Sequence, residues 1–183
     1  MSKTNGDKLL QAVIAIQKTK DSEAFRYVYD LLSPQLYFTA LRYLNDEAEA
    51  KDVLQESFVT VYLKIKKYKG KGSFEGWVKR ILINNCLQRL KKRNKEELPI
   101  GEYLQHTEQN ESEDEQKAEL QKRLLQGLKL LPDGFRTILN LYVLENYSHK
   151  EIAQLLGIKE SSSRSQLNRA KQALKKILNS HVS

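Results

Sequence analysis

The sequence predicts an all-α protein in which two small helical domains are joined by a flexible acidic linker. Apolar residues recur at helical spacing along most of the chain, and little of it shows the alternation of a half-buried strand. The segment 94–119 carries nine acidic and two basic residues, whereas the whole chain has a formal net charge of +8. This acidic segment separates two basic halves, and a length of 183 residues suits either one medium domain or two small ones.

Four helices are predicted in the first half. Apolar stripes of helical period run through residues 8–19, 23–44, 47–66 and 74–93. Polar residues that commonly begin helices precede the last three stripes: Asp21 or Ser22, then Asn45-Asp46, then Ser73. Within the second stripe, Ser33-Pro34 predicts a bend or a break, because proline lacks the backbone donor of a helix interior.

The linker and the second half follow. Residues 94–116 combine low hydrophobicity with high charge, so ordering them would bury too little apolar area to offset the lost chain entropy. Helices are expected to resume near Lys117, to stop at Pro132-Asp133-Gly134 and to continue from Phe135 to Glu145. The predicted organisation is an N-terminal helical segment 1–20, a first domain 21–93, a flexible linker 94–116 and a second domain 117–183.

Residues 148–170 have the pattern of a helix-turn-helix. Small Ala153 lets a second helix approach the first, and Gly157, four residues later, can adopt the positive φ of the sharp turn. The angle between the two helices would be fixed by the apolar residues Ile152, Leu156, Ile158 and Leu167. One residue departs from the pattern: Ser163 stands where the motif usually has an inward Val or Ile. A serine hydroxyl at such a position can bond back to its own helix.

The polar and basic residues of the second helix of this motif predict that it binds double-stranded DNA. Such a helix places its first turns in the major groove, and the positive end of its dipole favours phosphate. The side chains expected to face phosphates and base edges are Ser161, Ser162, Arg164, Ser165, Gln166, Asn168 and Arg169. An ordinary helical hairpin with a glycine turn is the alternative interpretation of the same spacing.

A second cationic cluster lies between Lys64 and Arg93, where eleven basic residues accompany a single acid, Glu75. The aromatic residues interleaved with them are Tyr62, Tyr68, Phe74 and Trp77. Cations that contact the backbone, together with rings that stack on unpaired bases, are typical of single-strand binding. The loop Gly70–Ser73, placed before a helix, would form a pocket for a flipped base. Taken singly, Phe74 and Trp77 are better explained as core residues.

Two segments of the first domain resemble region 2 of the bacterial sigma-70-family RNA polymerase sigma factors, in their compact extracytoplasmic-function (ECF) group: DVLQESFVTVYLKI (52–65) and YKGKGSFEGWVKRILINNCLQRLKKR (68–93). In the second domain, LPDGFRTILNLYVLENYSHKEIAQLLGI (131–158) is similar to region 4, within a resemblance that covers 120–178. The resemblance implies a factor that binds RNA polymerase core and directs promoter-specific transcription initiation. Region 2 of the family recognises and melts the −10 element, and region 4 reads the −35 element.

The resemblance also implies roles for single residues. Contacts with the polymerase clamp are expected from Asp52, Gln55, Glu56 and Phe58. Contacts with the −10 element are expected from Lys69, Gly70, Lys71, Ser73, Phe74, Trp77, Arg80, Asn84 and Asn85. Contacts with the −35 element are expected from the polar residues of the helix-turn-helix named above. The implied partners are the polymerase core (the clamp of its largest catalytic subunit and the flap region of the second largest), promoter DNA in double-stranded and melted form, and an anti-sigma factor.

Other classes of function fit the sequence less well. No apolar run approaches the ~18–20 residues of a membrane span, and a single cysteine fits a reducing cytoplasm. Asp52 and Glu56, four residues apart, have no histidine beside them, so we expect no metal, no cofactor and no enzyme activity. The main alternative is a helix-turn-helix regulator that binds DNA without polymerase and dimerises on a palindrome. A hydrolase using Asp52 and Glu56, or a helical adaptor that does not touch DNA, has less support.

Overall fold

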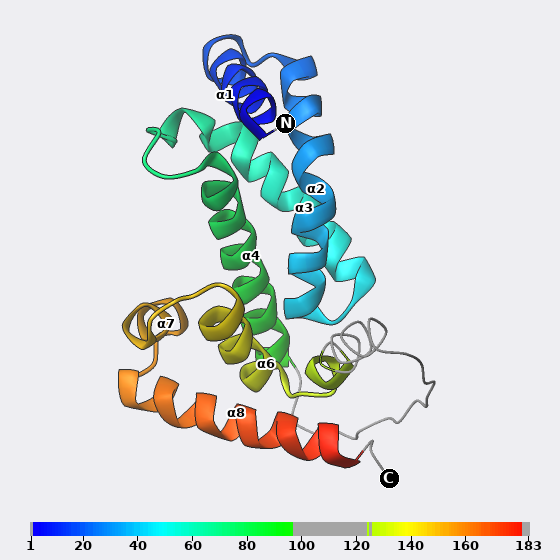
Figure 1. Cartoon of the computed structure of the whole chain (residues 1–183), viewed down its shortest axis with the longest axis vertical. Coiled ribbons are helices and arrows are strands. Elements are labelled where there is room, and N and C mark those ends of the chain that lie inside the picture. Colours follow the sequence, from blue (N-terminus) through cyan, green and yellow to red (C-terminus); the bar gives the residue numbers. More distant parts are fainter. Residues whose placement is uncertain (1, 97–123, 125, 181–183) are drawn as a thin grey trace. The chain divides into compact units, whose positions relative to one another are not determined.

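The computed structural model describes residues 2–96, 124 and 126–180, and within those ranges the regular structure is helical, with no β-strand (Figure 1). The prediction of an all-α fold is confirmed. The chain divides into two compact units, Met1–Arg93 and Asn94–Ser183. The prediction of a flexible linker at 94–116 falls, from residue 97 on, outside the described residues.

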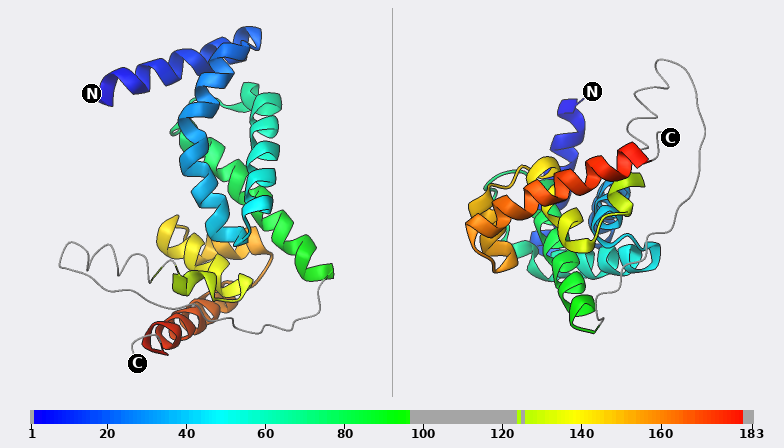
Figure 2. Two further views of the ribbon diagram at one scale, coloured as in Figure 1. Left: turned by 90° about the vertical axis from the view of Figure 1, so that its right-hand side faces the viewer. Right: turned by 90° about the horizontal axis from the view of Figure 1, so that it is seen from below.

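The first unit is built from four long helices and one short turn of 3₁₀ helix. These elements are α1 (Ser2–Thr19), α2 (Ser22–Leu44), α3 (Glu47–Lys64), η1 (Ile65–Lys67) and α4 (Phe74–Glu96). Helix α2 packs against both α1 and α3, and η1 packs against α1 (Figures 1 and 2). The boundaries of the second and third helices follow the predicted ones closely, whereas α1 begins at Ser2 rather than at residue 8 and α4 extends to Glu96, past Arg93.

The core of the first unit takes residues from all four helices. Its fully or almost fully buried side chains include Ile16 of α1, Tyr43 of α2, Val61 of α3 and Leu82 of α4. The single cysteine, Cys86, is also buried, and burial raises the pKa of its thiol to about 12. At neutral pH this thiol is therefore protonated and packs as a small apolar group.

Three of the predicted caps are present. Asp21 accepts a hydrogen bond from the backbone N–H of Ala24 and Asp46 accepts one from that of Glu49, both at 2.8 Å. Ser73 accepts one from the N–H of Gly76 at 3.0 Å, at the start of α4. Each satisfies a donor that the first turn of a helix leaves without an intrahelical partner.

Of the bend or break predicted at Ser33-Pro34, the break is absent, because α2 continues through Pro34 as one helix. Pro34 lies on the exposed face, while Leu32 and Leu36 on either side are buried in the core. Packing of the flanking turns compensates for the missing backbone donor, and tertiary contacts here override the local preference of proline.

The second unit contains a bundle of shorter helices around one long helix. They are α6 (Asp133–Leu139), the π-helical turn η2 (Asn140–Leu144), α7 (His149–Leu156) and α8 (Glu160–Ser180). Helix α8 packs against both α6 and α7. The predicted stop is present, since residues 130–132 are not helical; the next helix, α6, begins at Asp133 rather than at the expected Phe135, with Pro132 as its N-cap.

Arg136 is the polar anchor of the second unit. It is 3% exposed, and its guanidinium donates to the carbonyl oxygen of Leu131 at 2.8 Å and pairs with Asp133. A buried cation is tolerated only where such partners compensate for the lost hydration. This contact fixes the turn that precedes α6. Among the helices that the structure describes, none is long and apolar enough to cross a bilayer.

Candidate nucleic-acid interface

The glycine loop, defined here as Lys69–Ser73, joins η1 to α4 and is exposed along its whole length. Gly70 and Gly72 have φ values of +74° and +79°, the left-handed region that other residues rarely adopt. No neighbouring atom would obstruct an added Cβ at either position, so their backbone conformation, rather than space, calls for glycine. Lys69 and Lys71 present their ammonium groups from this loop to solvent.

Tyr68 closes the base of the glycine loop. Its hydroxyl donates to the carbonyl oxygen of Gly72 at 2.8 Å, and its ring packs against Phe74 and Trp77 with centroids 5.2 and 5.7 Å away. Phe74 is 5% exposed, whereas Trp77 is half-buried. Of the two aromatic residues expected to contact DNA, Phe74 therefore supports the loop from within, and Trp77 keeps an accessible edge.

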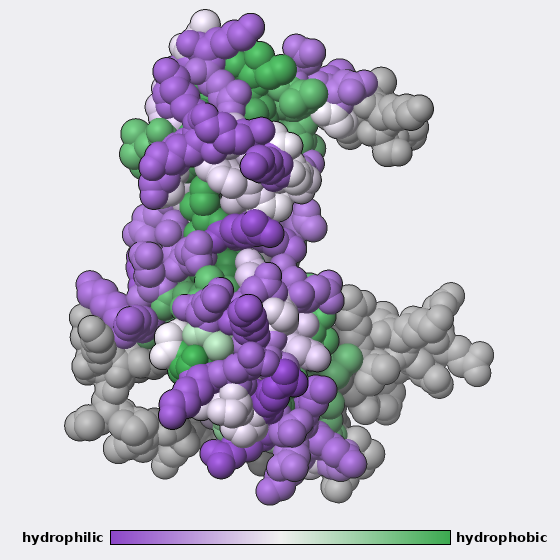
Figure 3. Space-filling model, turned by 90° about the vertical axis from the view of Figure 1, so that its left-hand side faces the viewer, coloured by the Kyte–Doolittle hydropathy of each residue, from purple (hydrophilic) through white to green (hydrophobic). Residues whose placement is uncertain are grey.

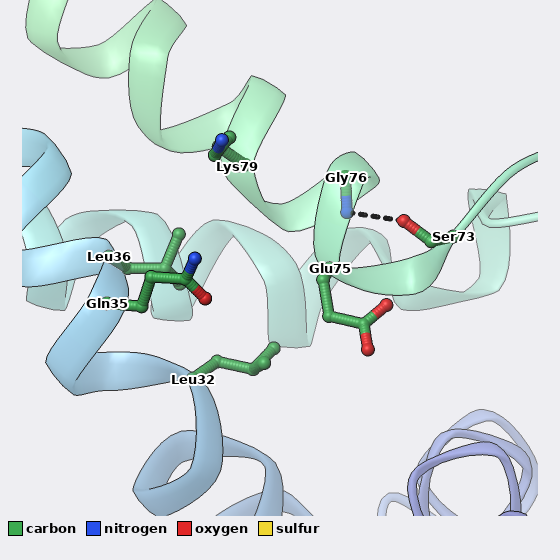
Figure 4. Close-up of a pocket in the computed structure, with 7 residues that line it drawn as sticks. All are labelled: Leu32, Gln35, Leu36, Ser73, Glu75, Gly76 and Lys79. Carbon is green, nitrogen blue, oxygen red and sulfur yellow. Dashed lines mark hydrogen bonds between the residues drawn. The ribbon is translucent and has the colours of Figure 1, made fainter. Parts of the chain in front are cut away.

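A pocket of about 230 Å³ lies beside this loop, between α2 and the first turns of α4 (Figure 4). Leu32 and Leu36 form its apolar side, and Gln35, Ser73, Glu75 and Lys79 supply polar groups. Gly76 lines the pocket with backbone only, next to the hydrogen bond to Ser73. An apolar wall with a few polar groups at its rim has the chemistry of a site for a planar polar ring.

Helix α4 presents different residues on its different sides. The exposed side carries Arg80, Asn84, Gln88 and Lys91 at helical spacing. The side toward α3 carries three polar residues: Asn85 donates to Ser57 at 3.0 Å, Arg89 pairs with Glu56 at 2.8 Å, and Arg93 pairs with Glu49. Asn85, expected to contact DNA, is thus engaged with α3, and two of the eleven basic residues are engaged with acids of α3.

The outer side of α3 carries the residues expected to contact polymerase. Asp52, Gln55 and Glu56 are exposed. Phe58 is not: it is 3% exposed and packs against Tyr29, with centroids 4.6 Å apart. The implied direct contact by Phe58 is corrected, because this ring lies on the core stripe of α3.

Two apolar residues extend the outer side of α3 instead. Val59 is 59% and Leu63 is 70% exposed, and both continue the spacing of Asp52, Gln55 and Glu56. Large apolar side chains exposed next to carboxylates are typical of a surface that binds protein. The i, i+3 and i+4 spacing of Val59 and Leu63 with the polar residues before them is visible in the sequence and could have indicated this surface.

The second unit contains a helix-turn-helix as predicted. Ser148 and Glu151 form a capping box at the start of α7, and Gly157 ends α7 with a φ of +68°. The residues of α8 expected to face DNA are exposed at Ser161, Arg164, Ser165, Asn168 and Arg169, and half-buried at Ser162 and Gln166. Arg164 pairs with Glu160 at 2.6 Å, and its side chain is 63% exposed. An exposed pair of this kind is weak, so phosphate can compete for the guanidinium.

Ser163 makes a contact between the two helices of the motif. Its buried hydroxyl lies 3.0 Å from Nδ1 of His149 at the start of α7. The imidazole stacks on Tyr142, with centroids 4.6 Å apart, and the ammonium of Lys171 lies over the Tyr142 ring. A polar contact between α7 and α8 thus stands where the motif usually has an apolar one.

The charge of the surface agrees with a polyanionic ligand. Figure 3 shows one face of the molecule, on which hydrophilic side chains predominate around smaller apolar patches. The exposed cations near the glycine loop and on α4 include Lys64, Lys66, Lys67, Lys69, Lys71, Arg80, Lys91 and Lys92. Such a cluster neutralises phosphates and releases counterions on binding. In the part of the chain that the structure describes, no cluster of three metal-ligating side chains is present.

Comparison with known families identifies both units. The model for sigma-70 region 2 matches residues 28–96, and the model for sigma-70 region 4 matches residues 121–174. The chain belongs to the sigma-70 family. The glycine loop and α4 fall within region 2, and the helix-turn-helix within region 4.

Relatives place the chain in the ECF group of this family. It is 31% identical over 153 residues to the ECF RNA polymerase sigma factor SigE of Mycolicibacterium smegmatis, covering 81% of this chain and 59% of that protein. It is 26% identical over 172 residues to SigW of Bacillus subtilis, covering 88% and 92%. Its fold resembles that of RpoE from Bartonella quintana, solved in complex with the anti-sigma factor NepR: the TM-score is 0.55 at 21% identity, over 85% and 96% of the two chains.

We expect His149 to make the stability of the second unit depend on pH. Burial is the main cause that lowers its pKa below 6.5; Arg164 and Lys171 add to this effect and Glu160 opposes it. The unfolded chain therefore binds a proton at a pH where the folded unit does not, so stability is complete above about pH 6.5 and falls below it. We predict that the second unit loses stability as the pH falls from 7.5 to 5.5. Hydrogen exchange of the α7 and α8 amides in urea measures this loss.

His149→Asn is the matched variant, since an amide can still bond Ser163 but does not titrate. In the His149→Asn variant, the stability of the second unit should change less between pH 7.5 and 5.5 than in the wild type. Ser163→Ala, which leaves the imidazole without its partner, should cost about 1 kcal/mol at pH 7.5. Equal pH dependence in the wild type and His149→Asn would contradict this role of His149.

Proposed function

We propose that this sigma-70 family member binds RNA polymerase core and directs promoter-specific transcription initiation, with the first unit melting the −10 element and the second reading the −35 element. The observation that carries the proposal is the presence of two unlike nucleic-acid surfaces on one chain. The glycine loop with its cations and aromatic base suits unpaired strands, and the exposed face of α8 suits intact duplex.

The proposed polymerase contact is the outer side of α3. Asp52, Gln55 and Glu56 would meet basic groups of the clamp, and Val59 and Leu63 would supply the apolar centre of the interface. Glu56 keeps 58% of its side chain exposed while it pairs with Arg89, so it can accept a further partner. Phe58 acts from within, by fixing the turn of α3 that carries these residues.

The proposed site for the −10 element comprises the glycine loop, Trp77, Arg80 and Asn84, with the pocket beside α2 taking an unstacked base. Leu32 would contact the flat face of the base. The carboxylate of Glu75 accepts hydrogen bonds but donates none, so it favours a base with an exocyclic amino group. Ser73 and Lys69 would contact the flanking phosphates.

The proposed −35 contacts are the exposed residues of α8 from Ser161 to Arg169. Asn168 and Arg169 have the side chains best suited to base edges, and Ser161 lies in the first turn, where the helix dipole favours phosphate. An anti-sigma factor is a further proposed partner, with the apolar residues on the outer side of α3 as its target. The protein would act in the cytoplasm, without cofactor or catalysis of its own.

In vitro transcription with purified core polymerase and genomic DNA from the same organism tests this function. The chain and core together should produce transcripts from specific start sites, and neither should do so alone. If the chain alone bound DNA, if addition of core did not change this binding, and if no transcript were made with core, the proposal would be contradicted. Such a result would favour the polymerase-independent regulator.

Arg169→Ala should weaken holoenzyme binding to the recovered promoters by about 1–3 kcal/mol, the usual range for one contact with a base edge. Lys175→Ala, also exposed on α8 but beyond the proposed reading surface, is the matched control and should have little effect. An equal loss in the two variants would indicate that α8 contributes only general charge.

Filling the pocket tests its proposed role. Gln35 is exposed at the rim, so Gln35→Trp should obstruct the pocket without disturbing the core. We expect promoter opening to fall about tenfold or more, the cost of losing one stacked base, at unchanged affinity for core. Permanganate reactivity of unpaired thymines measures opening, and Gln11→Trp on α1 is the control. If the Gln35→Trp variant opened the promoter as fully as the wild type, the pocket would be excluded as the site for the unstacked base.

A further inference from the structure

Helix α1 lies before the segment that matches region 2, yet it contacts the base of the glycine loop. The side-chain amide of Gln17 donates to the carbonyl oxygens of Ile65 and Tyr68, each at 3.0 Å. These partners are 48 and 51 residues away in the sequence. Gln17 is half-buried at this contact.

The chemistry of the contact suits a glutamine. The carbonyl of Tyr68 lies just past the end of η1, and that of Ile65 accepts the backbone N–H of Tyr68 within this 3₁₀ turn. An amide NH₂ offers two hydrogens, and Gln17 donates to both of these carbonyls, since a carbonyl oxygen that already accepts one hydrogen bond can accept a second. Lys20, just past the end of α1, adds a hydrogen bond to the carbonyl of Tyr62 and lies 4.2 Å above its ring.

Tyr68 links this contact to the glycine loop. Its backbone carbonyl is held by Gln17, while its hydroxyl holds the carbonyl of Gly72 and its ring packs on Phe74 and Trp77. A rotation of the Tyr68 peptide would therefore move both ends of the loop. Lys69 and Lys71, which lie between the two held points, would move with it.

We propose that Gln17 is a positioning residue for promoter opening, which holds the glycine loop in the conformation that accepts the melted strand. The inference rests on the proposed function. Attachment of α1 to the rest of the unit does not depend on this amide, since Leu9, Val13 and Ile16 bury its apolar side. Removing the amide should loosen the loop and leave the fold intact.

The variants Gln17→Met and Gln17→Glu test the proposal in the full chain. Methionine keeps the length and helix preference of glutamine but donates no hydrogen bond; glutamate places an acceptor against two carbonyl oxygens. Gln11→Met, exposed on the same helix, is the matched control. The readouts are affinity for core, melting temperature, and permanganate reactivity of a promoter fragment recovered with the wild-type holoenzyme.

Promoter opening should fall about tenfold in Gln17→Met, as expected for the loss of two side-chain hydrogen bonds, and further in Gln17→Glu. Affinity for core and melting temperature should stay within twofold and a few degrees of the wild type, as for Gln11→Met. A wild type that opens no promoter overturns the proposed function and this role with it. A wild type that opens promoters no better than Gln17→Met overturns this inference alone.

A second readout needs neither DNA nor polymerase. Trp77 is the only tryptophan of the chain and packs against Tyr68, so its fluorescence reports on the base of the loop. Acrylamide should quench Trp77 more strongly in Gln17→Met than in Gln11→Met or the wild type. Equal quenching, or a parallel loss of core binding and melting temperature, would show that Gln17 does not position the loop.

Discussion

The helical period of α4 is the constraint on which the first unit depends. One helix of 23 residues must bury an apolar side, pair with α3 on a second side and present a polar side to solvent. These sides are represented by Leu82, Arg89 and Asn84, and a shift of register by one residue would rotate each by ~100° into the wrong surroundings. The proposed DNA contacts on α4 therefore stand in a fixed relation to the polymerase-facing residues of α3.

Apolar burial, rather than ion pairing, holds α3 and α4 together. The pairs Arg89–Glu56 and Arg93–Glu49 are partly exposed, and such pairs contribute at most about 1 kcal/mol each. Core residues such as Val61 and Leu82 each contribute roughly 1.5–3 kcal/mol by leaving water. The polar contacts select the register, and the apolar ones supply the stability. The same division holds in the second unit, where His149 and Ser163 make a polar contact between α7 and α8, and Ile152 and Leu167 are buried on these two helices.

Local chemistry explains which features could be predicted from the sequence. Caps such as Asp46 and the positive φ of Gly157 depend on neighbouring residues only, and the sequence indicates both. The helix continues through Pro34 because distant packing overrides the local preference of proline, and Phe58 was misjudged because a core stripe and an outer side adjoin on α3. The contacts of Gln17 with residues 48 and 51 positions away, and that of His149 with Ser163, require the folded arrangement and have no sequence spacing of their own.

In the proposed complex, one helix pair faces polymerase on α3 and DNA on α4. Photo-cross-linking measures this directly, with a photoreactive amino acid placed at Gln55 or at Asn84 in the complete complex of chain, core and promoter. We expect cross-links from position 55 to the largest polymerase subunit and from position 84 to the promoter strand near the −10 element. Cross-links from position 55 to DNA, or from position 84 to polymerase alone, would contradict it.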